Sequence, residues 1–299
     1  MSLPHIRKNR IRRDASGKVI CTLSYLVMGL LGLFALLPFL HVISKGVSSA
    51  SAVTSGAVSF LPIGFQLETV FFVLTETIYP QALLNSAVVT VLGTLISMAV
   101  TITTAYPLSK TKLRGRKTIL VLYVFSMVFY GGMIPSYLVV KTLGLLDTYL
   151  ALILPFAIIQ FNMLIVKSYL EGLPESLEES ARLDGAGYWT ILLRIVCPIS
   201  KPVIATVSLL YAVNYWNNYF HAMLYTSSSS MKTLQLFLYD MIYSTEQIME
   251  KITAAQGAEL SIEGIRSAAI ILSILPIIVV YPLIQKYFVQ GITIGSVKG

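Results

Sequence analysis

Charged residues are scarce in this sequence. Of its 299 residues only 12% are Asp, Glu, Lys or Arg, whereas 56% are hydrophobic and the mean hydropathy is +0.76. Soluble globular domains carry roughly 25% charged residues, so this composition excludes an ordinary soluble protein. The large apolar content also excludes a disordered chain. The composition therefore favours a membrane protein.

Residue patterns that carry chemistry are scarce too. The chain has two cysteines, Cys21 and Cys197, which we expect to stay reduced near the cytoplasmic side, and its three histidines have no metal-ligand spacing. It has no phosphate-binding loop of the form G-x-x-x-x-G-K-[ST]. We therefore expect no disulfide, no metal, no catalytic residue and no cofactor bound by this chain. Any nucleotide chemistry has to come from another subunit.

The net charge of +8 is not distributed as a nucleic-acid-binding surface. Six of the 22 Lys and Arg residues precede residue 19, and five lie within residues 110–117. Both clusters adjoin long uncharged stretches, which is the pattern of membrane topology signals. No aromatic-interleaved basic surface accompanies them, so we expect no nucleic-acid partner.

Long uncharged intervals predict the membrane-spanning segments. A helical span needs about 20 mostly apolar residues to cross a ~30 Å hydrocarbon core. Six intervals are long enough, and they lie at residues 19–44, from near Ala82 to Lys110, 118–140, 148–166, 202–231 and 267–285.

The distribution of Lys and Arg predicts the orientation of these spans. With a cytoplasmic N-terminus, the four cytoplasmic segments carry six, five, four and two of these residues, and the outer segments carry five in total. Positive charge accumulates on the cytoplasmic side, so both termini are predicted to be cytoplasmic. The first span is interpreted as an uncleaved anchor, because its apolar stretch is longer than the ~7–15-residue core of a signal peptide.

The loop 171–201 between the fourth and fifth spans is predicted to contain a helix. Pro174 suits a first helical turn, the glutamates that follow complement the positive end of the helix dipole, and Gly185 ends the helix. One face is mostly apolar and is predicted to dock on a partner. An interfacial amphipathic helix is the alternative, but the basic face expected of one is missing. The residues of the predicted docking face are Leu173, Leu177, Ala181 and Asp184.

Part of this loop resembles a known family motif. The segment is Glu179-Ser180-Ala181-Arg182-Leu183-Asp184-Gly185-Ala186, followed by Ile195, Pro198 and Pro202. It is similar to the E-A-A…D-G-A…I…P motif of binding-protein-dependent ABC importer permeases, with Ser180 in place of the usual second Ala. In that family the segment is the coupling helix, which sits in a cleft of the ATPase subunit. The resemblance implies ATPase-coupling roles for Glu179, Ser180, Ala181, Asp184, Gly185 and Ala186.

Two of these residues have more specific expected roles. Glu179 is expected to make a charged contact with the ATPase, and Asp184 to form a bond that organises the turn at Gly185. A purely local capping role for Asp184 is the alternative. The resemblance also implies the fold class, which is all-α: a polytopic membrane protein with six transmembrane helices and the type I ABC importer permease fold, in the bacterial cell membrane.

Other segments are similar to sugar permeases of the maltose-transporter type. They are Asn85-Ser86, residues 105–109, 133–135 and 143–148, Trp216-Asn217-Asn218 and the ending 290–299, which resembles importers of oligosaccharides derived from complex polysaccharides or glycans. This resemblance implies a second homologous permease subunit, two copies of an ABC ATPase that hold ATP and magnesium, and an extracytoplasmic sugar-binding protein. The chain itself is then not an enzyme. Its implied regions are a basic cytoplasmic tail 1–18, a permease domain 19–290 and a cytoplasmic tail 291–299.

The outer segments and the C-terminal tail carry further expectations. In the resembled family the loop matching 226–265 faces the binding protein, so docking is expected there and along residues 45–79; a solvated loop is the alternative. Glycines in the tail predict a flexible strand that reaches between the ATPase subunits, or else a disordered terminus.

Polar residues in the fifth predicted span suggest a path for the substrate. Amides supply donors and acceptors for sugar hydroxyls, and aromatic rings pack against the C–H face of a pyranose. We predict that Asn214, Asn217 and His221 share one helical face. Alternatively the amides bond to neighbouring helices, and the aromatic residues form an interfacial belt. The candidate path residues are Asn214, Tyr215, Trp216, Asn217, Asn218 and His221.

The sequence therefore predicts a permease subunit of an ATP-driven, binding-protein-dependent oligosaccharide importer that works by alternating access. Import of another solute, such as a peptide, would share the coupling motif. An ion-gradient-driven transporter would need intramembrane charges, which the six uncharged intervals lack. A membrane-embedded hydrolase would need a nucleophile with a base, and no such arrangement is visible in the sequence.

Overall fold

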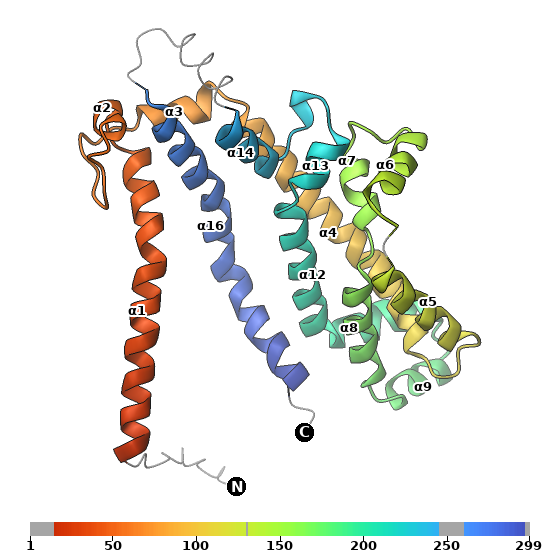
Figure 1. Ribbon diagram of the computed structural model, residues 1–299. Helices are drawn as coiled ribbons and strands as arrows, with labels where there is room; N and C mark the ends of the chain where they lie inside the picture. The colour runs from red at the N-terminus through yellow and green to blue at the C-terminus, as the bar shows by residue number, and fades with distance from the viewer. Residues whose placement is uncertain (1–14, 130, 245–259, 297–299) are drawn as a thin grey trace.

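The computed structural model describes residues 15–129, 131–244 and 260–296, and every regular element within these ranges is a helix (Figure 1). The α-helices are α1 (Ala15–Gly46), α2 (Ala50–Thr54), α3 (Glu68–Thr75), α4 (Tyr79–Ser109), α5 (Arg116–Val128), α6 (Met133–Thr142), α7 (Tyr149–Ile153), α8 (Gln160–Glu171), α9 (Ser176–Leu183), α10 (Tyr188–Ile191), α11 (Cys197–Ile199), α12 (Lys201–Trp216), α13 (Phe220–Tyr225), α14 (Leu234–Tyr243) and α16 (Ile262–Ser296). Short turns of 3₁₀- or π-helix occupy Leu154–Phe156, Leu192–Val196 and Ser229–Met231.

Three helices are long and apolar enough to cross a bilayer unbroken. Their candidate spans are Val19–Gly46 in α1, Tyr79–Ser109 in α4 and Ile262–Val280 in α16. At 1.5 Å per residue, α4 extends about 46 Å, which exceeds the hydrocarbon core. The first, second and sixth predicted spans are confirmed as helices of sufficient length.

The other three spans are pairs of helices that meet at a bend. α5 and α6 meet at 111°, the segment Tyr149–Phe156 meets α8 at 52°, and Tyr188–Ile199 meets α12 at 85°. Gly132, with φ of +91°, precedes α6, and Pro202 lies in the first turn of α12. Glycine at positive φ and proline both interrupt helical hydrogen bonding. With each pair counted as one span, the described residues contain six, as predicted.

α4 is the central helix and packs against α8 and α12 (Figure 1). A Cβ atom at Gly93 would lie 2.8 Å from ring carbons of Tyr215, so glycine is required for this close approach of α4 and α12. Hydroxyl pairs join the same two helices, since Ser97 Oγ lies 2.8 Å from the Tyr215 hydroxyl and Thr101 Oγ1 lies 2.7 Å from the Tyr211 hydroxyl. Such bonds pair polar atoms that would otherwise be unsatisfied in an apolar interior.

α1 stands apart from the bundle and contacts α16 (Figure 1). None of the residues in its most apolar window is buried. An apolar surface of this size requires lipid or another subunit against it. The described beginning of α1 and the described end of α16 lie at the same end of the molecule as α9, which agrees with termini on one side of the membrane.

The fifth predicted span is wrong as a single helix over 202–231. α12 ends at Trp216, and α13 begins only at Phe220. The backbone N–H of Asn217 makes the last regular helical bond, to the carbonyl of Val213 at 3.1 Å, and its side-chain amide donates to the same carbonyl at 3.0 Å. The N–H of Asn218 donates instead to the carbonyl of Tyr215, three residues back, at 3.3 Å, so the helix ends here. Asn218 then caps α13, since its Oδ1 accepts from the backbone N–H of His221 at 3.2 Å.

The C-terminal third is more helical than predicted. The segment 226–265 contains α14, whose Leu234 and Phe237 are buried with residues of α3 and α16, so its described part is packed against the bundle. Residues 291–296 continue α16 as a helix, so the predicted flexible strand is wrong there. Residues 1–14, 245–259 and 297–299, which hold most of the basic N-terminal tail, three acidic residues of the predicted outer loop and the end of the tail, lie outside the described residues.

Candidate functional site

The predicted coupling helix is α9, and its C-terminal turn is closed by the main chain. Gly185 has φ of +78°, its N–H donates to the carbonyl of Arg182 at 3.0 Å, and the N–H of Ala186 donates to the carbonyl of Ala181 at 2.9 Å. These two bonds form a Schellman motif, which explains why glycine follows Asp184. The carboxylate of Asp184 is exposed and forms no hydrogen bond with the described residues, so it does not organise this turn.

The faces of α9 differ from the predicted arrangement. Leu173 and Ala181 were expected to dock on a partner, but both are half-buried and pack against the chain's own core. Glu179 and Ser180 are exposed, and the hydroxyl of Ser180 donates to the carbonyl of Ser176 at 2.6 Å. Leu177, which is 39% exposed, and Asp184 remain exposed, so only part of the predicted face seats α9 on its own subunit, and Glu179 faces outward.

Glu178 is the residue that sequence reasoning missed. It is 8% exposed, forms an ion pair with Lys110 and accepts a hydrogen bond from the Tyr106 hydroxyl at 3.3 Å. Arg182, one turn further along α9, lies 3.7 Å away. The glutamate cluster of α9 was interpreted only as a complement to the helix dipole, whereas Glu178 binds the end of α4. The signal available in the sequence was the i, i+4 spacing of Glu178 and Arg182.

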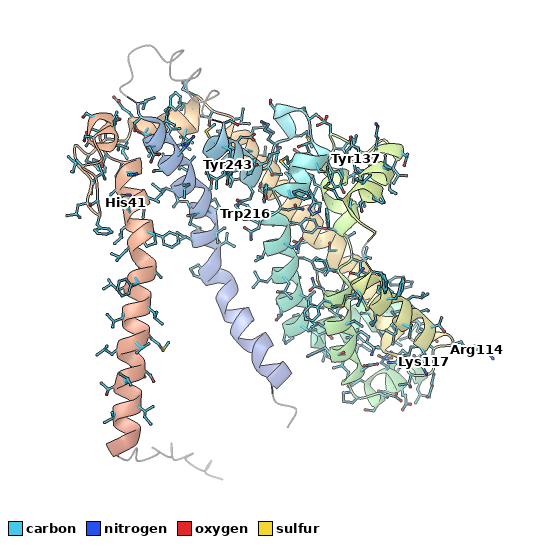
Figure 2. All side chains as sticks on the ribbon, in the orientation of Figure 1. His41, Arg114, Lys117, Tyr137, Trp216 and Tyr243 are labelled. Carbon is cyan, nitrogen blue, oxygen red and sulfur yellow. The ribbon has the colours of Figure 1, made fainter. Side chains whose placement is uncertain are left out.

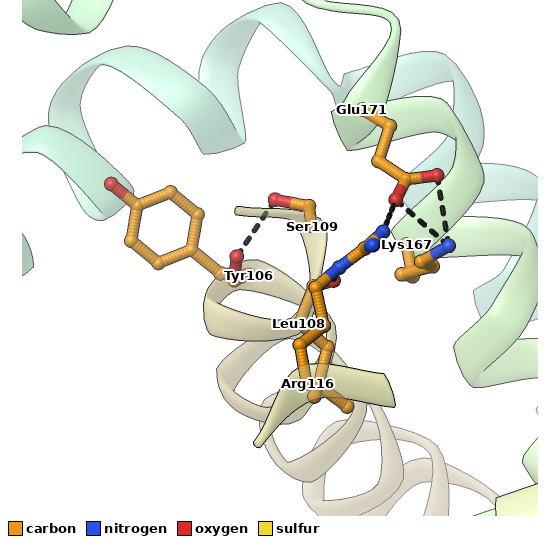
Figure 3. Close-up of polar contacts among 6 residues, drawn as sticks. All are labelled: Tyr106, Leu108, Ser109, Arg116, Lys167 and Glu171. Carbon is orange, nitrogen blue, oxygen red and sulfur yellow. Dashed lines mark hydrogen bonds and ion pairs between the residues drawn. The ribbon is translucent and has the colours of Figure 1, made fainter. Parts of the chain in front are cut away.

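A second polar cluster joins α4, α5 and α8 at the same end (Figure 3). Arg116 forms an ion pair with Glu171, and its Nε donates to the carbonyl of Leu108 at 2.8 Å. Lys167 lies 2.8 Å from Glu171 on the same helix. The basic turn after α4 is therefore bound to both α4 and α8.

The end of α4, the turn after it, α9 and α10 line an open cavity of about 690 Å³. Apolar side chains next to it are exposed: Leu183 is 90% exposed, and Tyr188 and Trp189 are about two-thirds exposed. The Arg182 guanidinium lies 5.0 Å from the centre of the Tyr188 ring. An exposed apolar group rimmed by charges is typical of a surface that binds another protein. The charged residues that line the cavity are Lys110, Lys112, Arg114, Arg182, Glu175, Glu178 and Glu179.

The candidate substrate-path residues do not form one face. Tyr215 is buried, and its hydroxyl lies 2.8 Å from Ser97 Oγ and donates to the carbonyl of Ile153 at 3.1 Å. Trp216 is half-buried against the cluster formed by α3, α14 and α16 (Figure 2). Asn214 is exposed on α12, and Asn217 is exposed directly after its end.

The break after α12 separates His221 from these amides. Nδ1 of His221 lies 2.8 Å from Oδ1 of Asn218, and its ring centre lies 4.2 Å from that of Phe156. The expected shared helical face of Asn214, Asn217 and His221 is therefore wrong, because the helix ends between them. Asn218, Tyr215 and His221 make contacts that stabilise the fold.

A row of tyrosines near this break was mostly missed. The ring centres of Tyr219 and Tyr239 are 5.3 Å apart, and those of Tyr239 and Tyr243 are 4.6 Å apart. Tyr243 is 70% exposed and lies on α14 (Figure 2). The four-residue spacing of Tyr239 and Tyr243 was visible, but the segment was interpreted as a loop, in which that spacing has no meaning.

Asn85 and Ser86 anchor the segment before α14. The Asn85 amide donates to the carbonyls of Ser230 and Lys232 at 2.7 and 2.9 Å, and its Oδ1 accepts from the Tyr149 hydroxyl at 2.8 Å. The hydroxyl of Ser86 accepts from the N–H of Leu234 at 2.8 Å. This dipeptide therefore holds the far end of α4 to residues 230–234.

The residues that the structure describes contain no group of three or more His, Cys, Asp or Glu side chains placed to hold a metal ion. Exposed charge is concentrated around α9 and the turn after α4. An apolar group with a charged rim offers contacts to another protein.

Comparison with known proteins identifies relatives along nearly the whole chain. Protein LplC of Bacillus subtilis (strain 168) is 42% identical over 95% of this chain and 96% of that protein, and the polygalacturonan/rhamnogalacturonan transport system permease protein YtcP of the same organism is 42% identical over 92% and 97%. A chain in the crystal structure of a bacterial ABC transporter involved in the import of the acidic polysaccharide alginate is 34% identical and has a TM-score of 0.87 over 92% of this chain and 98% of that one. Residues 92–294 match the family described as the binding-protein-dependent transport system inner membrane component, and the chain belongs to that family.

Proposed function

We propose that this chain is the permease subunit of an ATP-driven oligosaccharide importer. The support is family membership together with relatives whose names describe transport of polygalacturonan, rhamnogalacturonan and arabinooligosaccharides. The chain forms half of the translocation path, and a second, homologous permease forms the other half. Two copies of an ABC ATPase hold ATP and magnesium, and an extracytoplasmic protein delivers the sugar. Both termini of the chain lie in the cytoplasm.

The observation that carries this proposal is the surface around α9. A short helix with an exposed glutamate, Glu179, stands next to the exposed apolar side chains of Leu183, Tyr188 and Trp189. The charged rim and apolar centre suit a protein cleft, and the family motif lies on this helix. The proposed ATPase-coupling residues are Glu179, Ser180, Ala181, Asp184, Gly185 and Ala186.

Some of these residues have separate tasks. Gly185 and Ala186 set the direction of the chain after α9 through the Schellman bonds, and Ala181 seats α9 on its own subunit. Glu179 and Asp184 are the acidic groups available to the ATPase, since both are exposed. ATP binding closes the ATPase dimer, moves α9 and opens the path outward, because only contacts that differ between two states can shift their balance.

For the substrate, an oligosaccharide from a complex polysaccharide is the proposed class. Asn214 on α12 and Asn217 directly after it are exposed amides and remain candidates for contacts with sugar hydroxyls. The named substrates of several relatives are acidic polysaccharides, so a transport panel has to include uronic-acid oligosaccharides next to neutral ones.

The test is mass spectrometry of the proteins that co-purify with the chain from its native membrane. We expect an ATPase, a second permease and a sugar-binding protein with the wild type, and a reduced amount of ATPase with Glu179→Ala. Glu175→Ala is the matched control, because Glu175 is exposed one residue before the start of the same helix. A chain that purifies alone and transports sugar without ATP would contradict the proposal.

A further inference from the structure

Two adjacent glutamates of α9 face different surroundings. Glu179 is exposed to solvent, whereas Glu178 is buried against the C-terminal end of α4. An ionised carboxylate is removed from water only where other groups replace its hydration. The groups around Glu178 are therefore the contacts of the buried side of α9.

Three side chains replace the water around Glu178. Lys110 forms an ion pair with it, the Tyr106 hydroxyl donates to it at 3.3 Å, and Arg182 lies 3.7 Å away. Lys110 and Tyr106 belong to the end of α4, 68 and 72 residues earlier in the chain. Nζ of Lys110 also lies 4.9 Å from the centre of the Tyr106 ring. Two of the three partners thus connect α9 to α4.

Few other contacts hold α9. Among the described helices, none packs extensively along its length. Its apolar contacts come from half-buried side chains such as Ala181, which have little surface to bury. The polar cluster around Glu178 is therefore the most directional link between α9 and a membrane-spanning helix, since a buried ion pair that loses one partner leaves an uncompensated charge.

We infer that Glu178 is a positioning residue: it transmits movement of α9 to α4 through Lys110 and Tyr106. The inference rests on the proposed function, in which α9 is moved by an ATPase. Glu179 and Glu178 then have separate tasks on one helix turn. Glu179 contacts the ATPase, and Glu178 transmits the movement of α9 to α4.

The experiment uses the complete importer reconstituted in proteoliposomes with its ATPase and its binding protein. Three quantities are measured for each variant: the ATPase retained on the purified permease, the rate of ATP hydrolysis, and the sugar imported per ATP hydrolysed. The variants are Glu178→Gln and Lys110→Met. The matched controls are Lys117→Met and Lys141→Met, because both residues are exposed, neither lines this cavity and neither forms an ion pair within the described residues.

For Glu178→Gln and Lys110→Met we expect the ATPase to be retained within about twofold of wild type, while sugar imported per ATP falls about tenfold or more. Lys110→Met leaves the buried Glu178 carboxylate without its charged partner at the end of α4, and Glu178→Gln removes the charge that Lys110 binds. The controls stay within about twofold of wild type in all three quantities, as exposed charges contribute little. The exchange Lys110→Glu with Glu178→Lys restores an opposite-charge pair. We expect it to recover at least half of the coupling lost in either single reversal.

Two results would overturn the inference. One is an unchanged sugar-to-ATP ratio in Glu178→Gln and Lys110→Met. The other is a parallel loss of retained ATPase and transport that the charge exchange does not repair, which would mean that Glu178 only stabilises α9. Failure of the proposed docking is a separate result, namely full ATPase retention in Glu179→Ala.

Discussion

Replacing Gly93 by alanine tests whether α4 and α12 are packed as closely as the structure shows. A Cβ at this position would lie 2.8 Å from the nearest carbons of the Tyr215 ring. Carbon atoms pack best at about 3.5–4.0 Å, so the added methyl group is about 0.7 Å or more too close. The ring cannot easily swing away, because its hydroxyl is bonded to both Ser97 and the carbonyl of Ile153.

The expected cost follows from this geometry. Overpacking a filled core destabilises by about 1–3 kcal/mol. Alanine also favours a helix over glycine by about 0.5–1 kcal/mol, which opposes the steric term. Gly29→Ala in α1 isolates that second effect, because a Cβ at Gly29 would have nothing within 4 Å. The difference between the two variants is therefore the steric cost alone.

The assay is reversible unfolding of the purified chain in mixed micelles, followed by circular dichroism. We expect Gly29→Ala to match or slightly exceed wild type and Gly93→Ala to fall about 1–3 kcal/mol below Gly29→Ala. In a Tyr215→Ala background the Gly93→Ala penalty should disappear, since residues in contact are not additive. Equal stabilities of Gly93→Ala and Gly29→Ala would refute the close packing of α4 and α12.

Two further predictions concern the anchors of the predicted outer side. Asn85 is fully buried, so Asn85→Ala leaves two carbonyls and the Tyr149 hydroxyl without partners and should cost about 2–4 kcal/mol in the same unfolding assay. Asn214→Ala is the control and should cost less than about 1 kcal/mol, because Asn214 is exposed and its side chain forms no hydrogen bond within the described residues; an equal loss would contradict the anchor. Hydrogen bonds from the backbone N–H groups of Ser228 and Ser227 hold the pKa of the Asp147 carboxyl below its ordinary value of 3.8. A carboxyl whose pKa is lowered in the folded state contributes stability that is present above pH 3.8 and is lost as the pH falls through the folded-state pKa. Acid should therefore loosen this turn less in Asp147→Asn than in wild type, which protease cleavage measured between pH 5 and pH 2.5 can show. Identical acid profiles of the two proteins would contradict this prediction.

The unbroken helices could be predicted from the sequence, but the bends could not. A long uncharged interval reports only that a segment tolerates the membrane, which is why α1, α4 and α16 were located and the angles within the other spans were not. At the break after Trp216 the side-chain amide of Asn217 donates to the carbonyl of Val213. An asparagine in an apolar run predicts polarity, but whether it bonds to a sugar, a neighbouring helix or its own backbone depends on the fold.

The coupling segment was predictable to a different degree. Glycine after Asp184 sufficed to predict the end of α9, because a Schellman turn requires positive φ. The direction of each face was not predictable, since Ala181 and Glu178 face the subunit's own core only because α4 ends beside them. Helical periodicity gives the angle between side chains on one helix and nothing about the neighbour that each side meets.

α4 is bound by polar side chains at both of its ends. Near one end, Asn85 and Ser86 hold residues 230–234, and near the other, Tyr106 and Lys110 hold Glu178 of α9. The two ends are joined by a helix without a break, unlike the three bent spans. Because a continuous helix resists compression and bending more than a loop does, a movement imposed on Glu178 is expected to reach residues 230–234 through α4. The hydrogen-bonding side chains at the two ends of α4 therefore connect α9 to residues 230–234 through one continuous helix.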